Sequence, residues 1–423
     1  MSRLLIKNAK ALVGTHTPGT TRVAGAAMAQ LPMIEHGWLL ARDGRIEALG
    51  TMADWPGISE WKDLKVIDAS GRYVLPGWCD PHTHTVFAAP RDGEFVDRIK
   101  GMSYQDIAAK GGGILNSALR LREMSEEDLF VQAKVRLDEM MRQGTVAVEI
   151  KSGYGLSLES ELKMLRVVRR LREALPLRIK ATLLAAHALP PEFAQDRAGY
   201  VRMITDELIP QAAAEGLADF VDVFCETNYF TVEEMTRVLE AGAKYDLRGK
   251  VHVNQFTSLG AIPAAVKAGA LSVDHLEVME NSDIAALALA PATIPTLLPS
   301  CSFFLRIPYA PARALIDAGT AVALASDHNP GSTPSGNMNL VLSLACIQLR
   351  ILPEEALNAA TLNASAAMDL GHELGSLTVG KRASFILTKE VPSLSYLPYA
   401  FGSDHIDTVI IDGEPVRAGA ALA

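Results

Sequence analysis

The stretch "TVAVEI", residues 145–150, is a short run of small and β-branched apolar residues that follows Gly144 and precedes a Ser-Gly-Tyr-Gly segment. An almost continuous apolar run of this length is typical of a strand that is buried on both faces. The chain continues into "SLESELKMLRV", residues 157–167, which is a helix-like run. Together the two segments predict one strand–helix unit of a parallel sheet covered by helices.

The same alternation of strand and helix recurs through the middle of the chain. The seven further strand candidates are "YVLPGWCDP" (73–81), "RIKATLLAAH" (178–187), "DFVDVFCE" (219–226), "KVHVNQ" (250–255), "LSVDH" (271–275), "ATIPTLLP" (292–299) and "AVALASD" (321–327). Eight units of this kind favour an α/β fold of the (β/α)8 TIM-like barrel type. A doubly wound open sheet is the alternative, but no Gly-x-Gly-x-x-Gly follows any early strand.

Start and stop signals mark two of the helices. Ser125 with Asp128, and Thr231 with Glu234, match the spacing of a capping box. Gly144 is placed to close the helix that begins at Ser125. We therefore expect helices to start directly after Ser125 and Thr231.

Both ends of the chain differ from this middle part. They contain short alternating apolar runs separated by turn residues, namely "LLIKNAKALV", "GWLLARDGRIEALG", "KVIDASGRYVLPG", "GSLTVGKRASFILTK" and "HIDTVIIDGEPV". We expect residues 1–75 and 373–423 to pair into one small, β-sandwich-like domain. Residues 76–372 are then expected to form the barrel.

Composition limits the classes of partner. The chain has 423 residues, of which 49% are hydrophobic and 21% charged, so it can bury a large core. Its formal net charge of -9 offers no basic surface for nucleic acid or for anionic membranes. There is neither a signal-peptide core nor an apolar run of about 18 residues, the length that a membrane helix needs. Nothing in the composition suggests that the protein binds a polyanion.

The four cysteines are far apart in the sequence. Cys79, Cys225, Cys301 and Cys346 form no Cys-x-x-Cys pair, so neither a disulfide framework nor a thiolate zinc site is indicated. Instead of these roles, we expect the cysteines to be small buried side chains in a protein of a reducing compartment. We therefore expect a cytoplasmic protein.

Polar side chains gather where the predicted strands end. His82 and His84 are two residues apart, so on an extended strand they point to the same side. Later strands end in, or are followed by, His187, His252, Gln255, His275 and Asp327. Each residue alone has an ordinary explanation, as a buried core histidine or a helix cap.

The grouping of these residues has a chemical meaning in a barrel. The carboxyl ends of all eight strands meet at one rim, which is where barrel enzymes place their active sites. Three imidazoles and one carboxylate at that rim would hold zinc or iron and leave a coordination position open for water. The sequence therefore predicts a metal-dependent active site.

Longer motifs extend this prediction. The chain resembles the amidohydrolase superfamily through "DPHTHTVFAAPRDGEF", "YQDIAAKGGGI", "VEIKSGYGLSLESELKMLRV", "AAHALPPEF", "VDVFCE", "KVHVNQF", "SVDHLE" and "ASDHNPGSTP". Within that superfamily it is most similar to the members of histidine degradation that hydrolyse 4-imidazolone-5-propanoate. The segments "EIKSGYGL" and "DHNPGS" are the most specific part of the resemblance, which covers nearly the whole barrel.

The resemblance implies one metal ion, Zn²⁺ or Fe³⁺, held by His82, His84, His252 and Asp327. Superfamily members with two metals usually bridge them with a modified lysine that ends strand four. Strand four here ends in "FCETN", without a lysine, and Lys151 follows strand two. A mononuclear site is therefore the better expectation.

The resemblance also implies the reaction and the substrate contacts. Hydrolysis of a ring amide C–N bond would give N-formimidoyl-L-glutamate, and a guanidinium at Arg91 would grip the propanoate. A salt bridge at the rim is the alternative role for this arginine. The other implied pocket residues are Tyr104, Tyr154, His187, Gln255, Asn329, Gly331 and Ser332. The family resemblance further implies a homodimer.

Three positions depart from the family pattern. Gln255 stands where a number of relatives have glutamate, and an amide cannot act as a general base. Asn254 stands where relatives usually have aspartate. His328 stands where relatives often have an aromatic residue. We therefore expect Gln255 to orient water or the ring, and His275 and Asp327 to transfer protons.

Two rival functions share the scaffold. A deaminase of cyclic amidines or nucleobases would keep the metal ligands and release ammonia, although "EIKSGYGL" and "NPGS" argue against it. A scaffold protein without catalysis would have lost metal ligands, and all four are present in this sequence.

Overall fold

The computed structural model describes residues 3–59, 63–103, 106–107 and 110–419. Within these residues, eight parallel strands pair in chain order from β6 to β13. A parallel bridge joins Thr83, at the end of β6, to His328 in the segment after β13, so the sheet nearly closes into a barrel. The strands are β6 (Trp78–Thr83), β7 (Thr145–Lys151), β8 (Arg178–Ala186), β9 (Phe220–Cys225), β10 (Arg248–Val253), β11 (Ser272–His275), β12 (Ile294–Leu297) and β13 (Ala323–Leu324). The predicted (β/α)8 barrel is confirmed.

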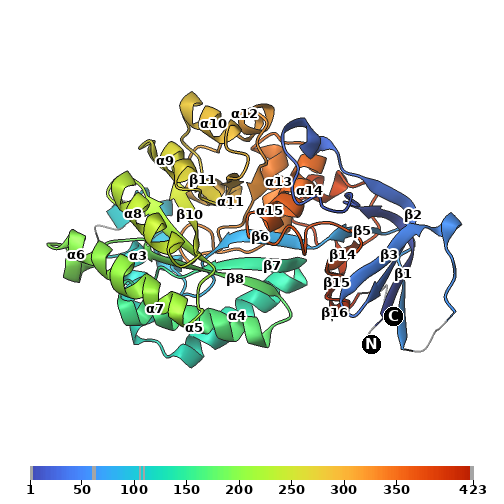
Figure 1. The fold of residues 1–423 in the computed structure, drawn as a ribbon, viewed down its shortest axis with the longest axis horizontal. Helices are drawn as coiled ribbons and strands as arrows, with labels where there is room; N and C mark the ends of the chain where they lie inside the picture. The colour runs from blue at the N-terminus through green and yellow to red at the C-terminus, as the bar shows by residue number, and fades with distance from the viewer. Residues whose placement is uncertain (1–2, 60–62, 104–105, 108–109, 420–423) are drawn as a thin grey trace.

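Helices surround this barrel, as Figure 1 shows. In chain order they are α1 (Asp92–Ile99), α3 (Gly113–Glu123), α4 (Glu126–Arg142), α5 (Leu158–Ala174), α6 (Arg197–Arg202), η4 (Met203–Leu208), α7 (Ile209–Ala214), α8 (Val232–Ala243), α9 (Ala261–Lys267), α10 (Asn281–Ala288), α11 (Pro299–Leu305), α12 (Ala312–Asp317), α13 (Met338–Ile347), α14 (Pro353–Ala360), α15 (Leu362–Ala366) and α16 (Tyr396–Tyr399). Three short helices, η1 (Gly25–Ala29), η2 (Met52–Asp54) and η3 (Pro191–Phe193), lie in connecting segments.

The predicted helix boundaries are confirmed. The Ser125 side chain accepts a hydrogen bond from the Asp128 N–H at the start of α4, and Thr231 and Glu234 form a reciprocal capping box at the start of α8. Gly144 follows the end of α4 with φ +103°, a conformation that favours glycine.

A second sheet is built from both chain ends and lies beside the barrel, at the right of Figure 1. In the described residues it has eight strands: β1 (Arg3–Val13), β2 (Met33–Arg42), β3 (Arg45–Thr51), β4 (Leu64–Asp68), β5 (Tyr73–Pro76), β14 (Phe385–Thr388), β15 (Ile406–Ile411) and β16 (Glu414–Arg417). The hairpins β2–β3 and β15–β16 turn at Asp-Gly pairs whose two residues have positive φ. The small β domain from both ends is confirmed, and its boundaries at residues 75 and 372 stay predictions.

The strand predicted over residues 73–81 is wrong as a single element. Its first part, β5, pairs with β1 and β14 in the small sheet, whereas β6 begins the barrel. Gly77 separates the two, and a Cβ on this glycine would lie 2.2 Å from Val146 Cγ1. The chain thus passes from one sheet to the other at Gly77, where only a glycine leaves room for Val146.

Successive side chains on a barrel strand point alternately toward the surrounding helices and into the barrel interior. On β7, the side chains of Val146, Val148 and Ile150 belong to the same apolar cluster as residues of the surrounding helices. Glu149 and Lys151 alternate with them and therefore face the barrel interior. Both side chains are completely buried. The interior thus holds charges directly below the ends of the strands.

Candidate active site

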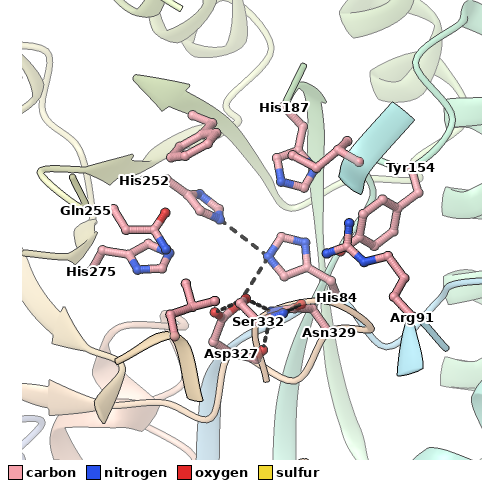
Figure 2. Close-up of a pocket in the computed structure, with 13 residues that line it drawn as sticks. His84, Arg91, Tyr154, His187, His252, Gln255, His275, Asp327, Asn329 and Ser332 are labelled. Atoms are coloured by element: carbon pink, nitrogen blue, oxygen red, sulfur yellow. Dashed lines mark hydrogen bonds and ion pairs between the residues drawn. The ribbon is translucent and has the colours of Figure 1, made fainter. Parts of the chain in front are cut away.

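The four predicted metal ligands converge at the carboxyl end of the barrel. His84 Nε2 lies 3.4 Å from both His82 Nε2 and His252 Nε2. Asp327 Oδ1 is 3.7 Å from the Nε2 atoms of His82 and His84. Figure 2 shows His84 between His252 and Asp327. His82 lies on β6, His84 directly after that strand, His252 on β10 and Asp327 in the segment after β13.

These spacings fit a tetrahedral cation. With metal–nitrogen distances of about 2.0–2.1 Å, the ligand atoms of a tetrahedral site are separated by roughly 3.3–3.4 Å. The observed spacings of 3.4 and 3.7 Å are close to that value. The donor set of three imidazoles and one carboxylate suits zinc or iron. The residues therefore fit the metal that the sequence predicts.

The protonation of the histidines supports the same conclusion. Burial, and then the nearby Lys151 charge, hold the pKa of His82 well below its usual value. Burial and the neighbouring His187 have the same effect on the pKa of His84. The two imidazoles are therefore neutral, and a neutral imidazole is the form that binds a metal.

His275 lies beside the predicted ligands. Among the described residues, the predicted ligands belong to two groups whose potential ligand atoms lie within 4.8 Å of one another, one of His82, His84 and Asp327 and the other of His82, His252 and His275. The four predicted ligands are thus divided between two groups that share His82. The position of His275 makes it either a fifth metal neighbour or a proton-transfer group.

Two buried aspartates stand behind the ligand histidines. His82 Nδ1 is hydrogen bonded to Asp274 Oδ2 at 2.6 Å, and His252 Nδ1 lies 2.9 Å from Asp222 Oδ2. A carboxylate at Nδ1 fixes the tautomer and leaves Nε2 for the metal. The register of β10 and β11 places His252 directly beside Asp274.

Lys151 lies between these two aspartates. It is the last residue of β7, and its Nζ is 2.8 Å from Asp222 Oδ2 and 3.6 Å from Asp274 Oδ2. Burial alone lowers the pKa of Lys151, but the surrounding carboxylates outweigh that effect and raise it. The surrounding carboxylates therefore favour the ammonium form of Lys151.

Strained backbone conformations turn the side chains of His275 and Asp327 toward the pocket. Ser272 and Asp274 face the barrel interior, so regular alternation would direct His275 outward. Instead His275 has φ +87° and Asp327 has φ +57°. Non-glycine residues in the left-handed region cost about 1–3 kcal/mol and are frequent at active sites.

Glu277 sets the charge of His275. Its Oε1 lies 3.2 Å from His275 Nδ1 and accepts a hydrogen bond from Ser302 Oγ. Burial lowers the pKa of His275, but the Glu277 carboxylate outweighs that effect and raises it to about 9. The Glu277 carboxylate therefore favours the protonated form of His275.

Arg91 lines the other side of the pocket. Its side chain is buried, and its Nε lies 3.6 Å from Glu94 Oε2. The backbone of Gly331 packs directly against the guanidinium, and Arg98 Nη2 donates to the Gly331 carbonyl at 2.6 Å. Figure 2 shows Arg91 and Tyr154 on the side of His84 that is opposite to Gln255 and His275.

The segment after β7 presents Tyr154 to the pocket. Glu161 of α5 is completely buried and accepts hydrogen bonds from the N–H groups of Gly153, Gly155 and Leu156 at 2.7–3.0 Å. Gly153 has φ +106°, and a Cβ there would lie 2.8 Å from His187 Nδ1. Glu161 therefore fixes the segment that carries Tyr154.

The segment after β13 is a tight turn. Asn329 Oδ1 accepts hydrogen bonds from the N–H groups of Gly331 and Ser332, and Asn329 Nδ2 donates to Ser332 Oγ. Ser332 Oγ in turn lies 3.2 Å from Asp327 Oδ2. These bonds orient the predicted ligand Asp327.

The structure brings most of the predicted site residues to one pocket. Its lining includes His84, Arg91, Tyr154, His187, His252, Gln255, His275, Asp327, Asn329 and Ser332. His82 and Gly331 are not part of this lining, and Tyr104 lies outside the described residues. Gln255 Nε2 donates to Cys301 Sγ at 3.4 Å, so its amide is held in place at the pocket wall.

Sequence reasoning missed the charged residues that support the site. Asp222, Asp274, Glu149, Lys250 and Glu161 received no role, although each is buried. The signal was present, because "TVAVEIK", "FVDVFC" and "SVDH" each place charge inside an apolar strand. Charged side chains are seldom fully buried unless they are paired.

Comparison with known proteins agrees with this geometry. Residues 73–416 match the model of the amidohydrolase family. The chain is 53% identical over 410 residues to an imidazolonepropionase of Flavobacterium johnsoniae, covering 97% of this chain and 99% of that protein. An imidazolonepropionase of Christiangramia forsetii is 51% identical, again over 97% of this chain and 99% of that protein.

Among solved structures, the guanine deaminase of E. coli has a TM-score of 0.75. It is 15% identical, with 99% of each chain covered, so this likeness concerns the fold alone. The two imidazolonepropionases are far more similar in sequence and match almost end to end. The chain therefore belongs to the amidohydrolase family and, within it, to the imidazolonepropionases.

Proposed function

We propose that this protein hydrolyses a ring amide C–N bond of 4-imidazolone-5-propanoate and forms N-formimidoyl-L-glutamate, a step of histidine degradation. One Zn²⁺ or Fe³⁺ ion would be held by His82, His84, His252 and Asp327. The convergence of these four side chains at 3.4–3.7 Å, in a pocket that Arg91 also lines, is the observation that supports the proposal.

The bound metal would supply Lewis-acid chemistry, lowering the pKa of a water molecule and polarising a carbonyl group. Arg91 suits the propanoate because a guanidinium can donate two parallel hydrogen bonds to a carboxylate. With Arg91 on one side of the ligand histidines, the ring would lie toward Gln255 and His275 (Figure 2). Gln255 would hold the ring or the water through its amide.

Two groups are suited to move protons. We propose that Asp327 accepts a proton from the attacking water at Oδ2, the oxygen that faces Ser332 Oγ. Glu277 favours the protonated form of His275, which would donate a proton to the ring nitrogen as the C–N bond breaks. Protons are thereby conserved, since one is taken from water and one is given to the leaving nitrogen.

The test is direct. Metal-loaded protein is added to 4-imidazolone-5-propanoate, the loss of imidazolone absorbance is followed, and the product is identified by mass spectrometry. We expect N-formimidoyl-L-glutamate without release of ammonia. Ammonia release from a purine, a pyrimidine or a cyclic amidine, without turnover of the imidazolone, would instead support the deaminase function.

We also propose that the protein is a cytoplasmic homodimer that binds neither nucleic acid nor membranes. The net charge of -9 argues against nucleic acid and anionic membranes, and the four cysteines without disulfides suit a reducing compartment, whereas the homodimer rests on the family resemblance alone. In the part of the chain that the structure describes, no helix combines the length and apolar character needed to cross a bilayer. Sedimentation analysis would test the dimer.

A further inference from the structure

The two aspartates behind the ligand histidines share one cation. We propose that Lys151 is a positioning residue, which fixes Asp222 and Asp274 against the Nδ1 atoms of His252 and His82 and thereby sets the affinity of the site for its metal. This inference rests on the proposed metal site. It assigns a role to a buried lysine that touches no predicted ligand directly.

The geometry is specific to one oxygen of each aspartate. Asp222 Oδ2 lies 2.9 Å from His252 Nδ1 and 2.8 Å from Lys151 Nζ. Asp274 Oδ2 lies 2.6 Å from His82 Nδ1 and 3.6 Å from the same Nζ. Each of these oxygens therefore lies between a ligand histidine and Lys151.

The second oxygen of each aspartate is held separately. Asp222 Oδ1 accepts hydrogen bonds from the N–H groups of Val223 and His252 at 2.6 and 3.2 Å. Asp274 Oδ1 accepts one from Ser272 Oγ at 2.6 Å. These bonds leave the Oδ2 atoms facing the histidines and Lys151. Among the described residues, Lys151 is the one lysine or arginine with an ion pair to either aspartate.

The positive charge of Lys151 explains why its contacts with Asp222 and Asp274 matter for metal binding. An ionised carboxylate at Nδ1 orients the ring and increases the basicity of the imidazole, and loss of such a partner lowers metal affinity by roughly 10- to 100-fold. Two carboxylates buried without a cation would repel each other and would be poorly solvated. Lys151 therefore keeps both carboxylates in the positions that the histidines need.

Lys250 offers a matched control in the same layer. It is as buried as Lys151, and its Nζ lies 2.6 Å from Glu149 Oε2. Its other hydrogen bonds go to the carbonyl groups of Pro81 and Ala367. Glu149 also accepts from Lys151 at 2.7 Å, so both lysines share this glutamate. Only Lys151 has ion pairs with the histidine-bound aspartates in the described part of the chain.

The experiment compares metal affinity in two charge-balanced variants. Glu149→Gln/Lys151→Met and Glu149→Gln/Lys250→Met each remove one buried charge of each sign. The zinc-loaded proteins are titrated with a chelator, and the unfolding temperature is recorded in parallel. We expect the Lys151 variant, which loses an ion pair with each aspartate, to bind Zn²⁺ about 10- to 100-fold more weakly, and the Lys250 variant, whose charge acts on Asp274 without an ion pair, to lose clearly less affinity.

A spectroscopic measurement separates positioning from general instability. The Co²⁺-substituted forms of the three proteins report ligand geometry through their visible spectra. We expect the spectrum to change in the Lys151 variant and to stay the same in the Lys250 variant. Should either double variant not fold, Lys151→Met and Lys250→Met are compared in the same assays.

Two results would overturn the inference: equal Zn²⁺ affinity in the Lys151 variant and the parent, or equal losses in both lysine variants. A parent that binds Zn²⁺ and hydrolyses the imidazolone, paired with an unaffected Lys151 variant, would refute the role of Lys151 alone. A parent that binds no stoichiometric metal would instead refute the proposed metal site, and the role of Lys151 with it.

Discussion

Arg91 occupies the space into which a side chain at position 331 would project. A Cβ built on Gly331 would lie 1.2 Å from Arg91 Nη2 and 2.1 Å from its Cζ. The φ angle of Gly331 is not in the left-handed region, so the backbone conformation itself does not require glycine. The absence of a side chain at this position is what gives the guanidinium its place.

Gly331→Ala should therefore act as a substrate-binding defect. The Arg91 guanidinium is the end of a flexible side chain and can move away, so the fold should survive. If Arg91 grips the propanoate, Arg91→Ala should cost about 2–5 kcal/mol in substrate capture, and Gly331→Ala should cost much of that amount. The measurement is kcat/KM for each variant, with metal content determined in parallel.

Gly93 supplies the control for this substitution. It lies in α1, two residues after Arg91, and a Cβ at this position would have no heavy atom within 4 Å. Gly93→Ala should therefore keep the parental KM. An unchanged KM in Gly331→Ala would show that the propanoate is bound elsewhere.

Removal of a predicted ligand should remove the metal as well as the activity. Asp327→Ala and His252→Ala each delete one of four ligand atoms, so both should lose bound metal in elemental analysis. His187→Ala is the matched control, because His187 lines the same pocket but donates through Nδ1 toward the Gly153 carbonyl at 3.0 Å. Full occupancy in both ligand variants would place the metal elsewhere.

The barrel and its rim of histidines were predictable because each strand is a local apolar pattern. Runs such as residues 145–150 identify the strands, and barrel topology then brings their ends together. The division of residues 73–81 between two sheets was not predictable, because it depends on contact between Gly77 and Val146, which are far apart in the sequence.

The charged residues within the apolar strands are visible in the sequence, but the way in which they pair is not. Whether Lys151 points into the barrel, and which carboxylates neutralise it, depends on the pairing of β7, β9 and β11 across the whole barrel. The positive φ of His275 was equally hidden, since strand alternation alone would turn this side chain away from the pocket.

Glu161 should matter for the substrate rather than for the metal. Its carboxylate accepts three backbone N–H groups from the segment that presents Tyr154. Glu161→Gln replaces one acceptor oxygen with a donor, which would leave a buried N–H group unpaired at a cost of about 1–3 kcal/mol. We expect KM to rise and metal content to stay at the parental level. A parental KM would show that Tyr154 is positioned without Glu161.

His328 should make the fold sensitive to acid. Burial, and then the charge of Arg136, lower the pKa of His328 to about 4. An imidazole in the unfolded chain titrates near 6.5, so as the pH falls the unfolded state takes up this proton first. The stabilisation is complete above about pH 6.5 and is lost toward pH 4, in total about 3 kcal/mol.

His328→Phe removes this ionisation. The free energy of unfolding, measured with urea at pH 7 and at pH 4.5 on equally metal-loaded proteins, should fall less in the variant than in the parent. Phe87, which lies edge-to-face with the His328 ring, remains in both proteins. Equal losses of stability on acidification would mean that His328 is not a source of acid sensitivity.

Gln255 and His275 separate orientation of the substrate from transfer of a proton. The Gln255 amide is held by Cys301 and cannot take up a proton at neutral pH, whereas His275 is paired with Glu277. Gln255→Glu should therefore remain active, with a new ionisation in the pH profile. His275→Ala should lose about 10²-fold or more in kcat, as expected for a proton-transfer group.

Metal content decides between the two possible roles of His275. It belongs to a group with His82 and His252 whose ligand atoms lie within 4.8 Å of one another, so it could also be a ligand. A slow His275→Ala enzyme with full metal occupancy supports proton transfer, whereas loss of metal would make His275 a ligand. The measurements are kcat/KM against pH and metal stoichiometry for His275→Ala, Gln255→Glu and Gln255→Ala. A fully active His275→Ala enzyme beside an inactive Gln255→Ala enzyme would make the Gln255 amide the central polar group of the reaction.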